Sequence, residues 1–209
     1  MPGEFIVQRG VGGLPEQGAG TGVDMSQRVA MFEDSLTIMR QLWAGETVNH
    51  DRFWGLKNAR IAPLPAQDIE VWIGATAPAA INRTARLAEG WLGTPSSTPQ
   101  QAKEQLNQYR QACAEHQRKP SAVALRRDIF IGASVRQAEE FRSHAVAKGY
   151  RGFPEDALIC GDISQVATQF AELFEAGFTD IIVRNMASDQ GQALATIEAL
   201  SDVKRQLRL

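Results

Sequence analysis

The chain alternates along its length between two patterns: short runs of β-branched and aromatic residues, and longer stretches with apolar residues at helical spacing. The strand patterns fall at residues 4–8, 69–74, 91–93, 125–133 and 180–184. Each is followed by a stretch that predicts a helix. Because strands connected through helices run parallel with right-handed crossovers, this alternation predicts an α/β fold around a parallel sheet. Five such units are fewer than the eight of a closed barrel, which typically needs about 250 residues.

Helix boundaries are indicated by capping residues. Asp24 or Ser26 is placed to cap the first helix, and Pro78 suits the first turn of the next. Ser134 with Gln137 has the spacing of a capping box.

Three segments carry no helical or strand period. Residues 10–22 form a glycine-rich loop, and a loop of this length tends to be functional or mobile. Residues 46–68 predict an extended or hairpin excursion, in which Trp54 is a candidate wall for a substrate. Residues 149–161 are expected to be irregular.

Composition indicates one globular domain over residues 1–209, since 44% of the residues are hydrophobic and 22% are charged. The net charge of −2 argues against nucleic acid or an anionic membrane surface as a partner. No stretch approaches the roughly 20 apolar residues of a membrane span. The N-terminal residues lack the pattern of a secretion signal, so we expect a cytoplasmic protein.

The cysteines and histidines do not predict a metal site. Cys113 and Cys160 lie far apart in the sequence and are expected to be free, buried thiols. His50, His116 and His144 show no ligand spacing.

Two strand ends carry the candidate binding residues. The strands at 4–8 and 69–74 both stop at small residues, and the carboxyl ends of parallel strands form the ligand side of such a sheet. A guanidinium, a hydroxyl and the N–H groups of a helix N-terminus together suit a phosphate group. We therefore predict a phosphate-bearing cofactor here. The candidate residues are Arg9, Gly10, Gly12, Gly74, Ala75 and Thr76.

Each candidate also has a plain structural interpretation. In that interpretation Arg9 is only a solvated loop residue, Thr76 caps the helix that starts near Pro78, and the glycines provide only backbone freedom.

Other conspicuous residues favour structural roles. Trp43, Trp72 and Trp91 are more often core residues than cofactor-stacking ones. The segment 126–128 begins a strand at its amino end, so a surface role is expected for its charges. Arg184 and Asn185 end the last strand on the carboxyl side, where they could line a pocket.

Several motifs together resemble one family. They are the glycine loop from Gly10 to Gly18, the helix from Arg28 to the Leu42-Trp43-Ala44-Gly45-Glu46 ending, the strand at 71–75, the Ala85–Trp91 segment and the last unit from Gly161 to Asp180. In these the chain resembles the luciferase-like flavin-dependent oxidoreductases, which include FMN-dependent monooxygenases and coenzyme F420-dependent reductases.

That resemblance implies a partial (β/α)8 TIM barrel. Residue 4 would enter at the fourth strand, so the first three units, which supply much of the flavin-ring pocket, are absent and no catalytic residue is assigned. Arg9 and Thr76 match the family positions that hold the FMN phosphate.

Three functions remain open from the sequence. The first is an enzyme that uses reduced FMN, as a monooxygenase acting with molecular oxygen on a small organic substrate. The second is an F420-dependent hydride-transfer reductase. The third is a non-catalytic flavin- or phosphate-binding remnant. Unpaired sheet edges would favour a homo-oligomer in each case.

Overall fold

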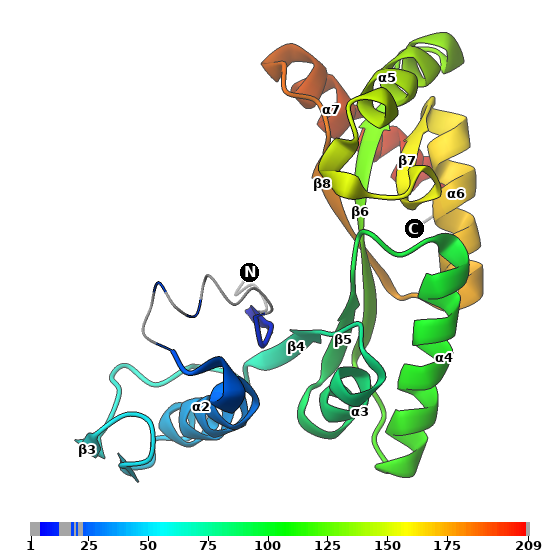
Figure 1. Cartoon of the computed structure of the whole chain (residues 1–209). Helices are drawn as coiled ribbons and strands as arrows, with labels where there is room; N and C mark the ends of the chain where they lie inside the picture. Colours follow the sequence, from blue (N-terminus) through cyan, green and yellow to red (C-terminus); the bar gives the residue numbers. More distant parts are fainter. Residues whose placement is uncertain (1–4, 13–17, 19, 21–22, 208–209) are drawn as a thin grey trace. The chain divides into compact units, whose positions relative to one another are not determined.

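The computed structural model describes residues 5–12, 18, 20 and 23–207 (Figure 1). The chain divides into two compact units, Met1–Val71 and Trp72–Leu209, which are described separately. The single-domain interpretation of residues 1–209 stays a prediction.

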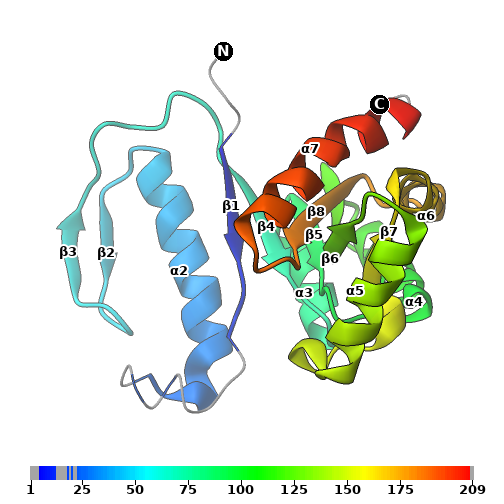
Figure 2. The same cartoon turned by 90° about the horizontal axis from the view of Figure 1, so that it is seen from above.

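The first unit is built around one helix. Its elements are β1 (Ile6–Arg9), η1 (Met25–Gln27), α2 (Arg28–Trp43), β2 (Val48–His50) and β3 (Leu56–Ala59). The helix buries Phe32, Leu36 and Ile38. Strands β2 and β3 pair antiparallel, which confirms the hairpin predicted within 46–68, and Figure 2 shows this hairpin beside α2. Asp24 caps η1 by accepting a hydrogen bond from the Ser26 amide.

The second unit holds a parallel sheet. Its strands are the end of β4 (Glu70–Gly74, which begins in the first unit), β5 (Gly90–Gly93), β6 (Ala122–Ile131), β7 (Leu158–Gly161) and β8 (Asp180–Asn185). Its helices are α3 (Pro78–Leu87), α4 (Pro99–Glu115), α5 (Val135–Ala147), α6 (Ile163–Ala176) and α7 (Gln190–Leu207), with short turns η2 (Tyr150–Gly152) and η3 (Glu155–Ala157).

The long strand β6 organises this sheet. On one edge β5 pairs with residues 122–125 and β7 with residues 128–131. On the other edge β8 pairs with residues 124–129. All of these pairs, and β4 with β5, are parallel, as the alternation of strands and helices predicts.

The two faces of β6 are covered differently, because side chains alternate along a strand. The odd-numbered side chains join the main core, together with α4 and α6. On the even-numbered face, the Phe130 ring stacks on Phe141 of α5 with 3.8 Å between centroids. Figure 1 shows α4 and α6 running along the sheet. Trp72 and Trp91 are buried, as expected for core residues.

Two sequence expectations about this sheet are wrong. Residues 149–161 are not merely irregular, since they include η2, η3 and the short strand β7. The strand predicted at 125–133 begins at Ala122, so Arg127 and Asp128 lie in mid-strand. Their exposed fractions are 1% and 0%, which rules out the surface role expected for them. Their partners come from distant segments, which a local sequence pattern does not reveal.

Candidate functional site

A polar hollow of about 260 Å³ opens in the second unit, where β4 and β5 end. The carboxyl ends of parallel strands are the usual ligand side of such a sheet. Its walls come from the residues after these strands and from the start of α4. They are Thr76, Pro78, Thr94, Ser96, Ser97, Gln101, Glu104, Gln105 and Gln108.

Thr76 lies at this hollow without capping the next helix. The residue is exposed, and the N-cap of α3 is Ala77, which makes no side-chain capping bond. Pro78 takes the first helical position, as its fixed φ favours. The positive end of α3 therefore begins next to the Thr76 hydroxyl.

Hydroxyl groups of the loop after β5 also line the hollow. The Thr94 and Ser96 hydroxyls lie 3.1 Å apart. Ser97 Oγ donates to Gln105 Oε1 over 3.3 Å. Thr98 caps α4 in a reciprocal capping box with Gln101, which occupies the amides of Thr98 and Gln101. Thr94 and Ser96 are thus the loop hydroxyls placed to meet a ligand.

A buried arginine supports this loop from beneath. Arg127 Nη1 donates to the carbonyl oxygens of Ser97 (3.0 Å) and Pro95 (3.4 Å). Arg127 Nη2 is buried and has no hydrogen-bond partner among the described residues. Burial lowers the pKa of Arg127 to about 10, while nearby Asp156 opposes that shift, so the guanidinium stays charged at neutral pH.

Sequence reasoning missed Arg127, although one signal was present. Arg127 lies two residues from both Leu125 and Ile129, and alternate residues of a strand share one face. The sequence therefore indicates a charged side chain on the core face of this strand. A charge in such a place needs a buried partner, and the carbonyls of the loop at 95–97 supply it.

The hollow suits an anion better than a metal ion. Its wall combines hydroxyls, amide side chains and a helix N-terminus above a buried guanidinium, all favourable to a phosphate group. Glu104 is the one acidic side chain on the wall, and it accepts a hydrogen bond from Gln100 at 2.7 Å. Among the residues that the structure describes, no three His, Cys, Asp or Glu side chains form a metal-binding group.

The other candidates on this strand end are less available. Ala75 is buried, its amide donates to Leu92 O over 3.4 Å, and its carbonyl accepts from Trp91 Nε1 over 2.9 Å. Gly74 ends β4 and pairs with Leu92. The phosphate roles predicted for Gly74, Ala75 and Thr76 stay predictions, and Thr76 has the most accessible side chain of the three.

Arg9, Gly10 and Gly12 belong to the first unit. Arg9 Nη1 contacts Met39 Sδ at 2.6 Å, and the guanidinium lies 5.4 Å from the centre of the Phe32 ring. Gly12 has a φ of +77°, a backbone conformation that favours glycine, whereas a Cβ at Gly10 would meet nothing within 4 Å. Their phosphate role also stays a prediction.

The other residues that the sequence suggested for the pocket differ in their contacts. Trp54 packs in the hairpin against the rings of His50 and Phe53. Asn185 bonds the backbone of Ala187 and Ala193, which makes it a local structural residue. Arg184 is exposed on β8. Cys113 and Cys160 are free and buried, as predicted.

Known proteins with a similar sequence or structure share this fold. The family described as luciferase-like monooxygenase matches residues 1–158. A monooxygenase, RslO1 from Streptomyces bottropensis, superposes with a TM-score of 0.80 at 18% identity, over 97% of this chain and 68% of that one. An F420-dependent secondary alcohol dehydrogenase superposes with a TM-score of 0.77 at 16% identity, over 100% of this chain and 71% of that one. The sheet is therefore a half-barrel of the luciferase-like type, with five to six β/α units.

Curated relatives match shorter stretches. An F420-dependent glucose-6-phosphate dehydrogenase of Microbacterium testaceum is 35% identical over 81 residues, 38% of this chain and 24% of that protein. A phthiodiolone/phenolphthiodiolone dimycocerosates ketoreductase of Mycobacterium sp. is 30% identical over 115 residues, 53% of this chain and 30% of that protein. The matches thus span about a quarter to a third of these relatives. Among the described residues, none of the helices combines the length and the apolar content that a membrane span requires.

Proposed function

Because the chain belongs to the luciferase-like monooxygenase family, we propose that it binds a flavin-type cofactor and serves an oxidoreductase reaction on a small organic substrate. The observation that carries this proposal is the hydroxyl-lined hollow at the ends of β4 and β5. We assign the phosphate group of the cofactor to that hollow. When bound, the cofactor supplies hydride transfer or reaction with molecular oxygen.

The residues present fit a phosphate. Thr76, Thr94 and Ser96 offer hydroxyl donors, and the N-terminus of α3 adds a partial positive charge. Arg127 adds a full charge behind the loop, although it reaches the wall only through the carbonyls of residues 95 and 97. The volume of about 260 Å³ is below that of pockets that hold a whole drug-sized ligand, about 300–1,000 Å³. It therefore suits the tail of a flavin.

FMN and F420 are the two candidate cofactors. We favour FMN with monooxygenase chemistry, because a phosphate monoester carries two charges and gains most from hydroxyl donors beside a helix N-terminus, as in the hollow. One of the similar structures is a type II Baeyer–Villiger monooxygenase from Pseudomonas putida in complex with FMN, with a TM-score of 0.66 at 17% identity over 94% of this chain and 69% of that one. The curated relative from Microbacterium testaceum favours F420 and hydride transfer instead.

The test compares cofactors that differ at the phosphate. Purified protein is titrated with FMN, riboflavin and F420, and binding is followed by flavin fluorescence. We expect Thr76→Val to weaken the affinity for FMN about 10-fold, because one hydrogen bond to a charged phosphate is lost. Riboflavin has no phosphate, so its affinity should not change.

Thr168→Val is the matched control, because Thr168 is exposed on α6 and donates only within its own helix. Equal weakening of FMN and riboflavin by Thr76→Val would contradict the phosphate assignment. Tight binding without turnover would favour the alternative of a non-catalytic binding protein. Self-association, predicted from the sheet edges, is checked by light scattering.

A further inference from the structure

A group of arginines lies around one buried carboxylate on the even-numbered face of β6. We propose that Arg126, Arg151 and Arg184 bind a negatively charged group of a small ligand, either a phosphate or a carboxylate. This site is separate from the hollow, because Arg127 and the main core occupy the opposite face of the same strand. The inference rests on the contacts of these residues and not on the proposed function.

Asp128 is the anchor of this arginine cluster. Its side chain is 0% exposed, and Arg126 Nη2 contacts its Oδ1 at 3.0 Å. Arg151 Nη1 lies 3.5 Å from Oδ2. The Tyr150 hydroxyl donates to the same Oδ2 at 2.9 Å. Burial and this bond raise the pKa of Tyr150 to about 12, so the phenol stays neutral and adds no negative charge.

Arg184 is placed beside the anchor by strand register. In the parallel pair of β6 and β8, Arg184 is the partner of Asp128, and Ile182 is the partner of Arg126. Paired residues in neighbouring strands share one face of the sheet. The alternate residues Ile181 and Val183 pack on the main core, which places Arg184 on the other face. Arg184 is exposed there.

The turn that carries Arg151 has an unusual backbone. Arg151 has φ 49° and ψ 13°, a left-handed conformation that costs a side-chain-bearing residue about 1–2 kcal/mol. Such residues gather at binding and catalytic sites. Here the turn aims the guanidinium at Asp128 and over the Phe153 ring, 5.0 Å from its centre.

The charges in the arginine cluster do not balance. The guanidiniums of Arg126 and Arg151 contact the one carboxylate of Asp128, and strand register places Arg184 on the same face of the sheet, so the arginines around Asp128 carry more charge than it balances. A purely structural network would tend toward neutrality, because unpaired charge at a partly buried site is costly. Arg126 and Arg151 are 28% and 39% exposed, and each has one nitrogen on Asp128. Their remaining N–H groups suit a phosphate or carboxylate.

The test titrates the full chain with inorganic phosphate and with succinate at low ionic strength, by calorimetry. We expect saturable binding of one of the two, and the preferred anion identifies the ligand class. Arg184→Gln should weaken this binding at least 10-fold, and Arg184→Lys should weaken it less. Arg184 is exposed, so neither variant should change the fold, which circular dichroism verifies.

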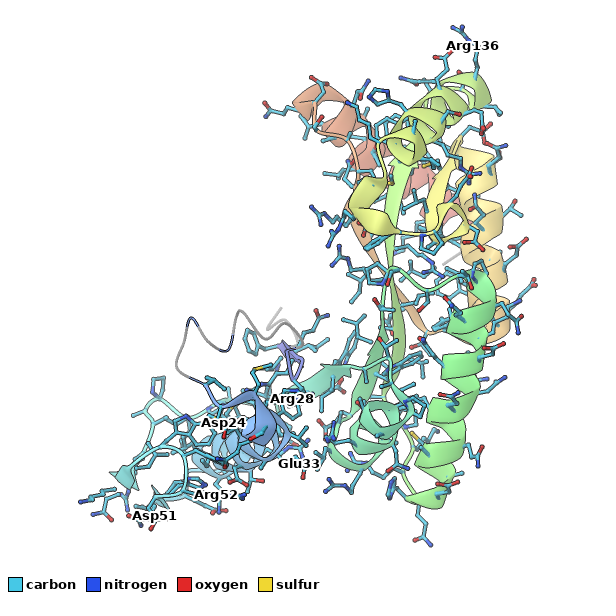
Figure 3. All side chains as sticks on the ribbon, in the orientation of Figure 1. Asp24, Arg28, Glu33, Asp51, Arg52 and Arg136 are labelled. Atoms are coloured by element: carbon cyan, nitrogen blue, oxygen red, sulfur yellow. The ribbon has the colours of Figure 1, made fainter. Side chains whose placement is uncertain are left out.

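Two control variants distinguish binding at the arginine cluster from binding in the hollow and from a general effect of surface charge. Arg136→Gln removes one positive charge from α5, where Arg136 is 87% exposed and pairs with Glu140 of the same helix (Figure 3 labels Arg136). It should leave the affinity unchanged. Thr76→Val tests whether phosphate binds in the hollow instead. If Thr76→Val abolishes phosphate binding and Arg184→Gln binds phosphate like the wild type, the cofactor proposal is supported and this inference is overturned. Absence of binding in the wild type, or equal losses in Arg136→Gln and Arg184→Gln, would also overturn it.

Discussion

Replacement of Arg127 by methionine tests the role of the buried guanidinium under the hollow. Methionine has a similar length and no charge, so it fills the space without the two bonds to the carbonyls of residues 95 and 97. We expect the stability of the second unit to change little. Binding of FMN should weaken clearly, because the loop with Thr94 and Ser96 loses its support.

Two opposing contributions set the change in stability. Burial lowers the pKa of Arg127 to about 10, and at about 1.4 kcal/mol per pH unit this shift corresponds to roughly 3 kcal/mol against the charged form. Methionine removes that cost. It also loses one good charge-assisted hydrogen bond and one long one, together about 2–4 kcal/mol. The net change in the free energy of unfolding should stay within about 1 kcal/mol.

Urea unfolding measures this difference, and FMN titration measures the effect on the hollow. The matched control is Arg127→Lys, which keeps the charge and loses the planar donor geometry. A loss of more than about 3 kcal/mol in Arg127→Met would refute the reasoning, since it would make the guanidinium mainly stabilising. An unchanged FMN affinity would show that the loop does not depend on Arg127.

Three further results are expected. If Arg9 has the phosphate role predicted from the sequence, Arg9→Ala should weaken FMN binding by about 1.5–3 kcal/mol through loss of one charge-assisted contact, and an unchanged dissociation constant would contradict that role. Gly90→Ala should destabilise the protein by about 1–3 kcal/mol, because the new Cβ would lie 2.7 Å from the Trp72 ring; a wild-type melting temperature would contradict this. Burial raises the pKa of the Cys160 thiol from 9.0 to about 11. The stability tied to this neutral thiol is therefore complete below pH 9 and falls by about 2–3 kcal/mol as the pH rises to 11; Cys160→Ala should lose less stability than the wild type over this range by that amount when unfolding is followed against pH.

The sequence alone predicts the architecture of the sheet. Strand patterns at 69–74 and 180–184 alternate with capped amphipathic helices, and this local information is enough for parallel pairing. It also places Thr76 after a strand, at the edge where such folds bind ligands. The motifs around residues 28–46 and 85–91 identify the family for the same reason, because they are short and contiguous.

Only the tertiary structure shows what the charged side chains do. Arg127 reaches carbonyls about 30 residues earlier in the chain, and Asp128 meets Tyr150 and Arg151 from a turn beyond α5. Arg184 joins them through strand register. Such contacts depend on which strands become neighbours and which face each residue takes. Alternation along a strand indicates the face that a residue such as Arg127 takes, but no local pattern contains the choice of neighbouring strands or their register.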